Sequence, residues 1–190
     1  MTAKKAILVH ACCASCSSYV LERLAESFEV TAYYFNPNIH PDTEYDLRLA
    51  EMRSVCDALG LRLVEGDCPK DRWWKEILPY RDLPEKSERC WTCYRFRLEE
   101  TARKAAELGI PLFTTTLSVS PHKAYERIAV FGGEAAARHG VEFLAEDFKK
   151  KDGFKISVAR SRERGLTRQD YCGCLMSYEE ALKRRDEEEA

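Results

Sequence analysis

The chain has 190 residues, with 30 basic and 32 acidic side chains and a formal net charge of −2. Hydrophobic residues make up 45% of it, which excludes a disordered chain, whereas a charge so close to zero neither requires nor excludes a nucleic-acid partner. The apolar run at residues 6–9 is too short for a secretion signal, and no run approaches the roughly 20 residues of a membrane helix. We therefore expect a cytoplasmic protein without a membrane partner.

The first third of the chain alternates short apolar runs with helical patterns. Residues 5–9 (KAILV) and 30–35 (VTAYYF) have the composition of buried strands, and residues 61–64 indicate a third strand. Helices are expected between them, at residues 16–28 and at residues 42–59, where apolar side chains recur on one helix face.

The alternation continues after a less regular stretch at residues 67–88. The elements expected here are a helix, a strand, a helix, a strand and a final helix, at residues 90–108, 112–119, 124–139, 141–144 and from 177 on. Alternating strands and helices predict an α/β fold, with a mainly parallel sheet flanked by helices in a Rossmann-like arrangement. Ligands of such sheets bind at the carboxyl ends of the strands.

Nine cysteines are the most unusual feature of the composition. An odd number in a chain of this length does not fit a disulfide scaffold, whereas clustered cysteines in a reducing compartment bind metals or carry out redox chemistry. Seven of them form three groups: Cys12, Cys13 and Cys16; Cys90 and Cys93; Cys172 and Cys174. We expect no functional role for Cys56, which lies on the apolar face of its helix, or for Cys68.

Cysteine-rich sites bind zinc, cuprous copper or iron–sulfur clusters, because thiolates are soft ligands. The pair Cys90 and Cys93 has the C-x-x-C spacing of a metal-binding motif at a helix start, where the helix dipole should favour thiolates. One zinc site or one cluster of four irons needs four ligands, and the seven clustered cysteines exceed this number by three. The surplus predicts a cluster with a second metal beside it, or a cluster with additional reactive thiols.

Five segments of the sequence resemble one known family. They are HACCASC (10–16), FNPNIHPDTEYDLR (35–48), CWTCYRFRL (90–98), FTTTLSVSPHK (113–123) and RQDYCGC (168–174). In this order and spacing they resemble the QueH family of epoxyqueuosine reductases, over residues 6 to about 182. One departure is Ser15, where the family commonly has proline, and it leaves the thiols in place.

The resemblance implies an adenine-nucleotide-hydrolase-like form of the fold, with a metal site at the carboxyl ends of the strands. Residues 1–190 would form a single α/β domain, in which residues 149–190 close over the metal site and residues 186–190 are an acidic tail. The resemblance also implies a [4Fe–4S] cluster with an adjacent iron, whose ligands are drawn from the seven clustered cysteines. Which cysteine binds which metal stays open.

The activity implied by the resemblance is removal of the epoxide oxygen of epoxyqueuosine at the wobble position of tRNA, which gives queuosine. This reaction consumes two electrons and two protons and releases water, so it also needs an electron donor, which the sequence does not identify. We hypothesise that the second iron binds the epoxide oxygen as a Lewis acid and that a nearby side chain protonates it. The candidate proton donors are His10, Tyr171, His122 and Asp147.

Contacts with tRNA are expected mainly between basic side chains and phosphates. Basic residues are frequent at positions 149–151, 155 and 160–168, and others flank the first two cysteine groups, namely Arg95, Arg97, Lys123 and Arg127. The side chains expected to bind the substrate are Asn36, Asn38, His40, Ser118, Ser120, Lys123 and Arg168.

Two other functions are compatible with part of this pattern. A cluster-dependent tRNA thiolase of related fold would use ATP and an SGGxDS loop after the first strand, where this chain has cysteines. A non-enzymatic zinc or iron–sulfur RNA-binding module would need only one four-ligand site, so replacing the surplus cysteines should have little effect on it.

Overall fold

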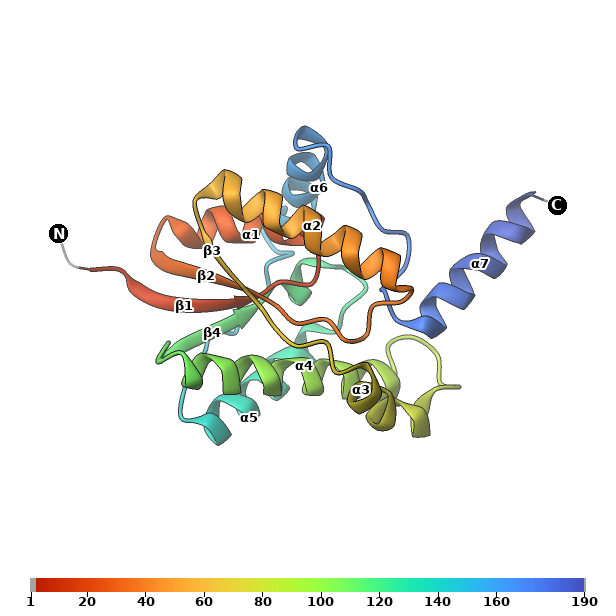
Figure 1. Ribbon diagram of the computed structural model, residues 1–190, viewed down its shortest axis with the longest axis horizontal. Coiled ribbons are helices and arrows are strands. Elements are labelled where there is room, and N and C mark those ends of the chain that lie inside the picture. Colours follow the sequence, from red (N-terminus) through yellow and green to blue (C-terminus); the bar gives the residue numbers. More distant parts are fainter. Residues whose placement is uncertain (1–2, 190) are drawn as a thin grey trace.

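A computed structural model describes residues 3–189 of the chain (Figure 1). Its strands are β1 (Lys5–His10), β2 (Phe28–Tyr34), β3 (Arg62–Glu65), β4 (Leu112–Thr115) and β5 (Glu142–Phe143). All of them pair in parallel, in the order β3-β2-β1-β4-β5. The predicted α/β fold with a parallel sheet is thereby confirmed. Of the predicted 1–190 domain, Met1, Thr2 and Ala190 lie outside the described residues.

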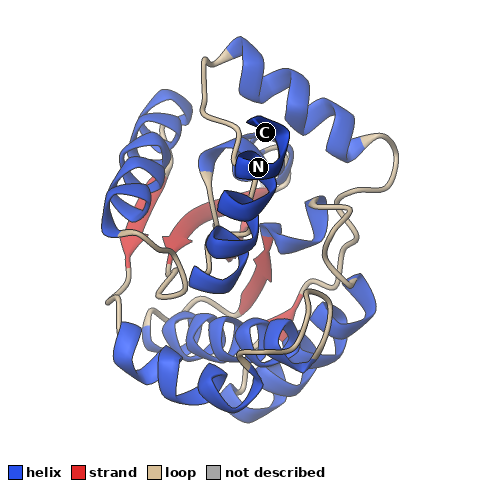
Figure 2. Ribbon diagram, turned by 90° about the vertical axis from the view of Figure 1, so that its right-hand side faces the viewer, coloured by secondary structure: helices blue, strands red, loops and turns tan. Residues whose placement is uncertain are grey.

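Helices cover both faces of the sheet (Figures 1 and 2). They are α1 (Ala14–Ala25), α2 (Asp42–Leu59), α3 (Lys70–Ile77), α4 (Glu88–Glu107), α5 (Tyr125–His139), α6 (Gly153–Glu163) and α7 (Leu175–Glu189), with the 3-10 turns η1 (Leu78–Tyr80) and η2 (Thr116–Val119). In the described part of the chain, no helix combines the length and hydrophobicity needed to cross a bilayer.

The two faces of the sheet belong to two separate hydrophobic clusters. Successive side chains of a strand point to opposite faces, so Ile7 and Val9 of β1 pack with residues of α1 and α2, whereas Leu8 packs with residues of α4 and α5. The short helix α3 adds the buried Trp73 to the second cluster. Both faces of the central strand are therefore fully covered, as expected for a parallel sheet.

The structure corrects the predicted strand at residues 112–119. β4 ends at Thr115, whose hydroxyl accepts a hydrogen bond from the amide of Leu117 (3.2 Å) and starts the 3-10 turn η2. This turn places residues 116–119 at the carboxyl edge of the sheet, next to the loop that follows β1.

Two helices, α3 and α6, were not predicted. The face of α6 that packs on α1 consists of the small residues Gly153, Ser157 and Ser161, and Ser157 donates a hydrogen bond to the carbonyl of Ser15 (2.8 Å). Because such a face carries no apolar stripe, hydrophobic periodicity does not reveal it. α3 has only eight residues, too few for a clear pattern.

Candidate metal centre

A cavity of about 400 Å³ opens at the carboxyl edge of the sheet. Its walls come from the loop after β1, the turn η2 after β4, helix α2 and the segment that leads into α7. β1 and β4 are neighbours in the sheet although they are far apart in the sequence, so the direction of the chain connections changes between them. This is the position at which α/β sheets bind ligands.

The first cysteine group lies at the N-terminus of α1, directly after β1. The thiol sulfurs of Cys12, Cys13 and Cys16 all lie within 4.8 Å of one another, close enough to hold one metal ion. Hydrogen bonds from Cys13 and then Cys16 hold the pKa of Cys12 well below its usual value, and Thr116 lies 3.6 Å from the Cys12 sulfur. The positive end of the α1 dipole favours the same thiolate.

The third cysteine group reaches the same cavity through Cys172. Cys172 lines the cavity, and the ammonium group of Lys123 donates a hydrogen bond to its sulfur over 2.7 Å. A hydrogen bond from Cys174 and the charge of Lys123 lower the pKa of Cys172. Cys174 is buried, and its thiol bonds to the hydroxyl of Ser177 (3.3 Å). Each of these two groups therefore provides one thiol that loses its proton readily.

Cys90 and Cys93 lie in the first turns of α4, both buried. Burial raises the pKa of both thiols, and the negative charge of nearby Cys172 raises it further. At this pair desolvation of the thiolates therefore outweighs the effect expected from the helix start. Loss of both protons would require a bound cation.

Buried cations surround the cysteines and fit an anionic metal centre. Arg48 and Arg97 are 3% and 2% exposed, and Lys123 lies against Cys172. Within the described residues, Arg97 pairs with no carboxylate; it donates hydrogen bonds to His10 Nε2 (3.3 Å) and to Asn36 Oδ1 (2.5 Å). A buried charge needs a counter-charge, and thiolates carrying a metal would supply it. The donor set and its electrostatics thus fit a thiolate-bound metal centre.

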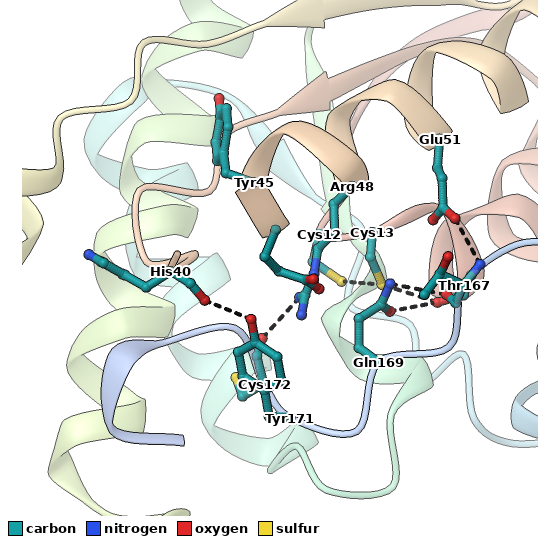
Figure 3. A network of polar contacts seen from close by, with 12 residues as sticks. Cys12, Cys13, His40, Tyr45, Arg48, Glu51, Thr167, Gln169, Tyr171 and Cys172 are labelled. Carbon is teal, nitrogen blue, oxygen red and sulfur yellow. Dashed lines mark hydrogen bonds and ion pairs between the residues drawn. The ribbon is translucent and has the colours of Figure 1, made fainter. Parts of the chain in front are cut away.

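The segment before α7 is tied down over this site (Figure 3). The hydroxyl of Tyr171 donates to the carbonyl of His40 (2.6 Å), and Arg48 Nη1 donates to the carbonyl of Cys172 (3.3 Å). The Thr167 amide donates to Glu51 (2.7 Å). These contacts hold the Cys172 turn against α2.

His10, a predicted proton donor, lies in the core beneath the cavity. It is fully buried, and burial together with the charge of Arg97 lowers its pKa to about 3. Its Nδ1 donates to the hydroxyl of Thr115 (2.8 Å) and its Nε2 accepts from Arg97. Asn36, predicted to bind substrate, also bonds internally, to Arg97 and to the carbonyl of Ala11 (2.9 Å). Both side chains hold the strand ends together.

The remaining predicted polar residues divide between the cavity and other places. Those that line the cavity are Ser120, His122, Lys123 and Tyr171. Asn38 is buried, the ring centre of His40 lies 5.9 Å from that of Trp73, and Arg168 is exposed. Ser118 bonds to the carbonyl of Glu146 (2.8 Å) and Asp147 pairs with Lys149 (3.2 Å).

Several of the basic residues expected to contact tRNA are already paired. Arg160 of α6 and Arg164, which directly follows that helix, both pair with Glu22 of α1. Arg95 stacks on Phe131 at 4.5 Å, and Arg127 stacks on Trp91 at 4.1 Å. Arg97 is buried and is therefore not part of a surface for RNA.

The cavity residues missed from the sequence include Arg48, Thr116 and Gln169. Arg48 lies on the same helix face as apolar Tyr45, Leu49 and Met52. A charged residue within an apolar stripe is unusual, and this feature of the sequence could have identified Arg48 as a candidate site residue. Of the two cysteines expected to have no role, Cys56 is buried in the core, where burial raises its pKa to about 11. Cys68 is half-buried in a loop.

Comparison with solved structures shows the class of fold. The chain aligns with a TM-score of 0.55 to the U34-tRNA thiolase NcsA from Methanococcus maripaludis with its [4Fe-4S] cluster, at 10% identity over 92% of this chain and 62% of that chain. The TM-score is 0.52 for a predicted subunit of tRNA methyltransferase from Methanocaldococcus jannaschii, at 13% identity over 85% and 89% of the two chains. At these identities the likeness shows the fold alone: a Rossmann-like α/β protein, here with a cysteine-rich site at its switch point.

Sequence comparison identifies the family within this class. The family model for epoxyqueuosine reductase QueH matches residues 7–180. Relatives named epoxyqueuosine reductase QueH are 40% identical in Helicobacter pylori, 34% in Streptococcus pyogenes and 33% in Thermotoga maritima, over 88%, 90% and 95% of this chain. The chain spans 48%, 70% and 92% of these three relatives. The chain belongs to the QueH family, which confirms the family predicted from the sequence.

Proposed function

We propose that the chain removes the epoxide oxygen of epoxyqueuosine at the wobble position of tRNA and so forms queuosine. The observation that carries this proposal is that Cys12, Cys13, Cys16 and Cys172 line one cavity in a member of the QueH family, with the buried pair Cys90 and Cys93 near enough to Cys172 for its charge to act on them. Two electrons and two protons convert the epoxide into an alkene and water. The electrons come from a low-potential one-electron donor outside this chain.

The seven clustered cysteines would hold a [4Fe–4S] cluster and an adjacent iron. When bound, this centre supplies single electrons and a Lewis-acidic iron. Four thiolates for the cluster leave three for the iron, and three thiols within 4.8 Å of one another exist in the group at the start of α1. Lys123 and Arg48 offset the negative charge that these thiolates bring into the cavity wall.

A proton must reach the departing epoxide oxygen, and we assign this role to His122. Of the four candidates, only His122 and Tyr171 line the cavity. The hydroxyl of Tyr171 already donates to the carbonyl of His40, and burial raises its pKa to about 12, which makes it a weak acid. His122 is exposed at the cavity, and imidazole is the side chain that most often acts as a general acid.

The tRNA would bind over the mouth of this cavity, with the wobble nucleoside entering it. Bases of an anticodon loop are accessible without opening a duplex. His122, Lys123 and Arg184 line the cavity. Arg168 is exposed and directly precedes Gln169, which also lines the cavity. A tRNA substrate places the reaction in the cytoplasm.

Anaerobic iron and sulfide analysis combined with turnover on epoxyqueuosine-containing tRNA tests the proposal. We expect about five irons per chain, four from a cluster and one beside it, and loss of the epoxide with release of queuosine. One zinc per chain without turnover would refute the proposal and favour a structural module. A tRNA thiolated in the presence of ATP would favour the thiolase.

A further inference from the structure

Arg48 is a buried cation that lies between two of the cysteine groups (Figure 3). Its side chain extends from α2 toward the cavity wall, where it is 3% exposed. Nε donates to Glu44 Oε1 (2.6 Å), Nη1 donates to the carbonyl of Cys172 (3.3 Å), and the guanidinium lies 5.3 Å from the ring centre of Tyr171. These contacts fix the orientation of the whole group.

One nitrogen of this group has no acceptor. Within the described residues Arg48 Nη2 is buried and makes no hydrogen bond. A buried donor without a partner costs roughly 1–3 kcal/mol, and more when it is charged, so native proteins rarely leave one. The group lines the cysteine cavity, which is where an acceptor for this nitrogen can lie.

Charge points to the same side of the guanidinium. The cavity that Arg48 lines also has Cys12, Cys13 and Cys16 in its wall, and their sulfurs lie within 4.8 Å of one another, so a metal centre on their thiolates would place negative charge beside the guanidinium. Among the described residues Glu44 is the single carboxylate that pairs with Arg48, and it accepts from Nε, which leaves Nη2 without an acceptor.

We propose that Arg48 is a positioning residue whose Nη2 donates to the sulfur-rich metal centre and whose charge raises the reduction potential of that centre. The inference rests on the proposed function, because it requires a redox-active centre at the cysteines. Reduction adds one negative charge, and a buried cation stabilises that charge strongly because the surroundings have a low dielectric constant. The same side chain donates a hydrogen bond to the carbonyl of Cys172 and so fixes this turn. One residue would therefore both orient a proposed ligand and raise the reduction potential of the centre.

A redox titration of the loaded protein, followed by electron paramagnetic resonance, tests the inference. Arg48→Met removes the positive charge, and Arg48→Lys keeps that charge but replaces the three guanidinium nitrogens by one. Glu44→Gln removes the negative charge that pairs with Arg48. Arg53→Met is the matched control, since Arg53 lies on the same helix but is exposed and pairs with Glu65 on the surface. Iron and sulfide contents of every sample are measured first.

At a fixed solution potential we expect Arg48→Met to lower the ratio of reduced to oxidised centre at least tenfold, which is 59 mV for a one-electron couple. Arg48→Lys should fall between Arg48→Met and the unaltered chain, and Glu44→Gln should raise the ratio several-fold. Arg53→Met should match the unaltered chain. The opposite signs for Arg48→Met and Glu44→Gln distinguish a charge effect from damage to the fold.

Equal potentials for Arg48→Met and Arg53→Met at equal iron content would overturn the inference. So would an unchanged potential accompanied by weaker tRNA binding, which would assign Arg48 to the substrate. If Arg48→Met does not retain iron, Glu44→Gln decides, and an unchanged or lower ratio there overturns the inference. Absence of any iron–sulfur centre from the unaltered chain would instead refute the proposed function.

Discussion

Gly173 between Cys172 and Cys174 gives a prediction whose size follows from the structure. Its φ of +114° lies in a region that side chains with a Cβ rarely adopt, and strain of this kind costs about 1–3 kcal/mol. A Cβ at this position would also lie 3.0 Å from Arg48 Nη1 and 3.2 Å from Ile39 Cγ1. Gly173→Ala should therefore destabilise the fold and displace the turn that carries the two cysteines.

At about 2–4 °C per kcal/mol for a chain of this size, Gly173→Ala should lower the melting temperature by about 2–12 °C. Its iron content after anaerobic reconstitution should fall as well. Gly133→Ala makes the same chemical change inside α5, where a Cβ meets no atom within 4 Å, and should stabilise the protein by up to about 1 kcal/mol. Thermal denaturation of loaded and chelator-treated samples gives the comparison. A Gly173→Ala protein with the same melting temperature and the same iron content as the unaltered chain would refute this reasoning.

Three further predictions concern the proposed centre and its substrate. Cys13→Ala should lose iron and turnover, whereas Cys56→Ala should keep both, because Cys56 is a core residue that does not line the cavity; iron analysis and turnover measure this. His122→Gln should keep its iron while turnover falls about 10²–10⁴-fold, and His139→Gln, at a histidine paired with Glu99, should leave turnover unaffected. Equal turnover of the two histidine variants would remove His122 from the mechanism. Affinity for tRNA should fall steeply between low and high salt in a filter-binding assay, since phosphate contacts release counterions, and a flat response would contradict tRNA binding.

The strand–helix alternation was visible in the sequence because the strands are short, apolar and separated by amphipathic helices. The range 42–59 predicted for α2 agrees with the structure at both ends, since its apolar stripe is regular. α6 escaped detection because its contact face is made of glycine and serine. The end of β4 was missed because Thr115 uses its side chain to start a turn, which composition alone does not reveal.

The polar part of the site was harder to predict than the fold. Sequence position near a cysteine suggested that His10 reaches the substrate, yet the last residue of a central strand points into the core, and its pKa falls accordingly. Arg48 lies 32 residues after Cys16 in the sequence and meets the cysteines only because α2 passes the carboxyl edge of the sheet. Such contacts depend on the packing of helices, which local sequence patterns do not describe.

The three cysteine groups are spread over more than 150 residues, and this order has a consequence in time. Ribosomes add about 5–20 residues per second, so Cys172 is made about 8–30 s after Cys16. Likewise β4, one of the two strands that pair with β1, is synthesised about 100 residues after β1. A complete set of the proposed ligands therefore exists only once residue 174 has left the ribosome. Iron delivered to a nascent chain would meet an incomplete site, so loading of this protein belongs after synthesis and folding.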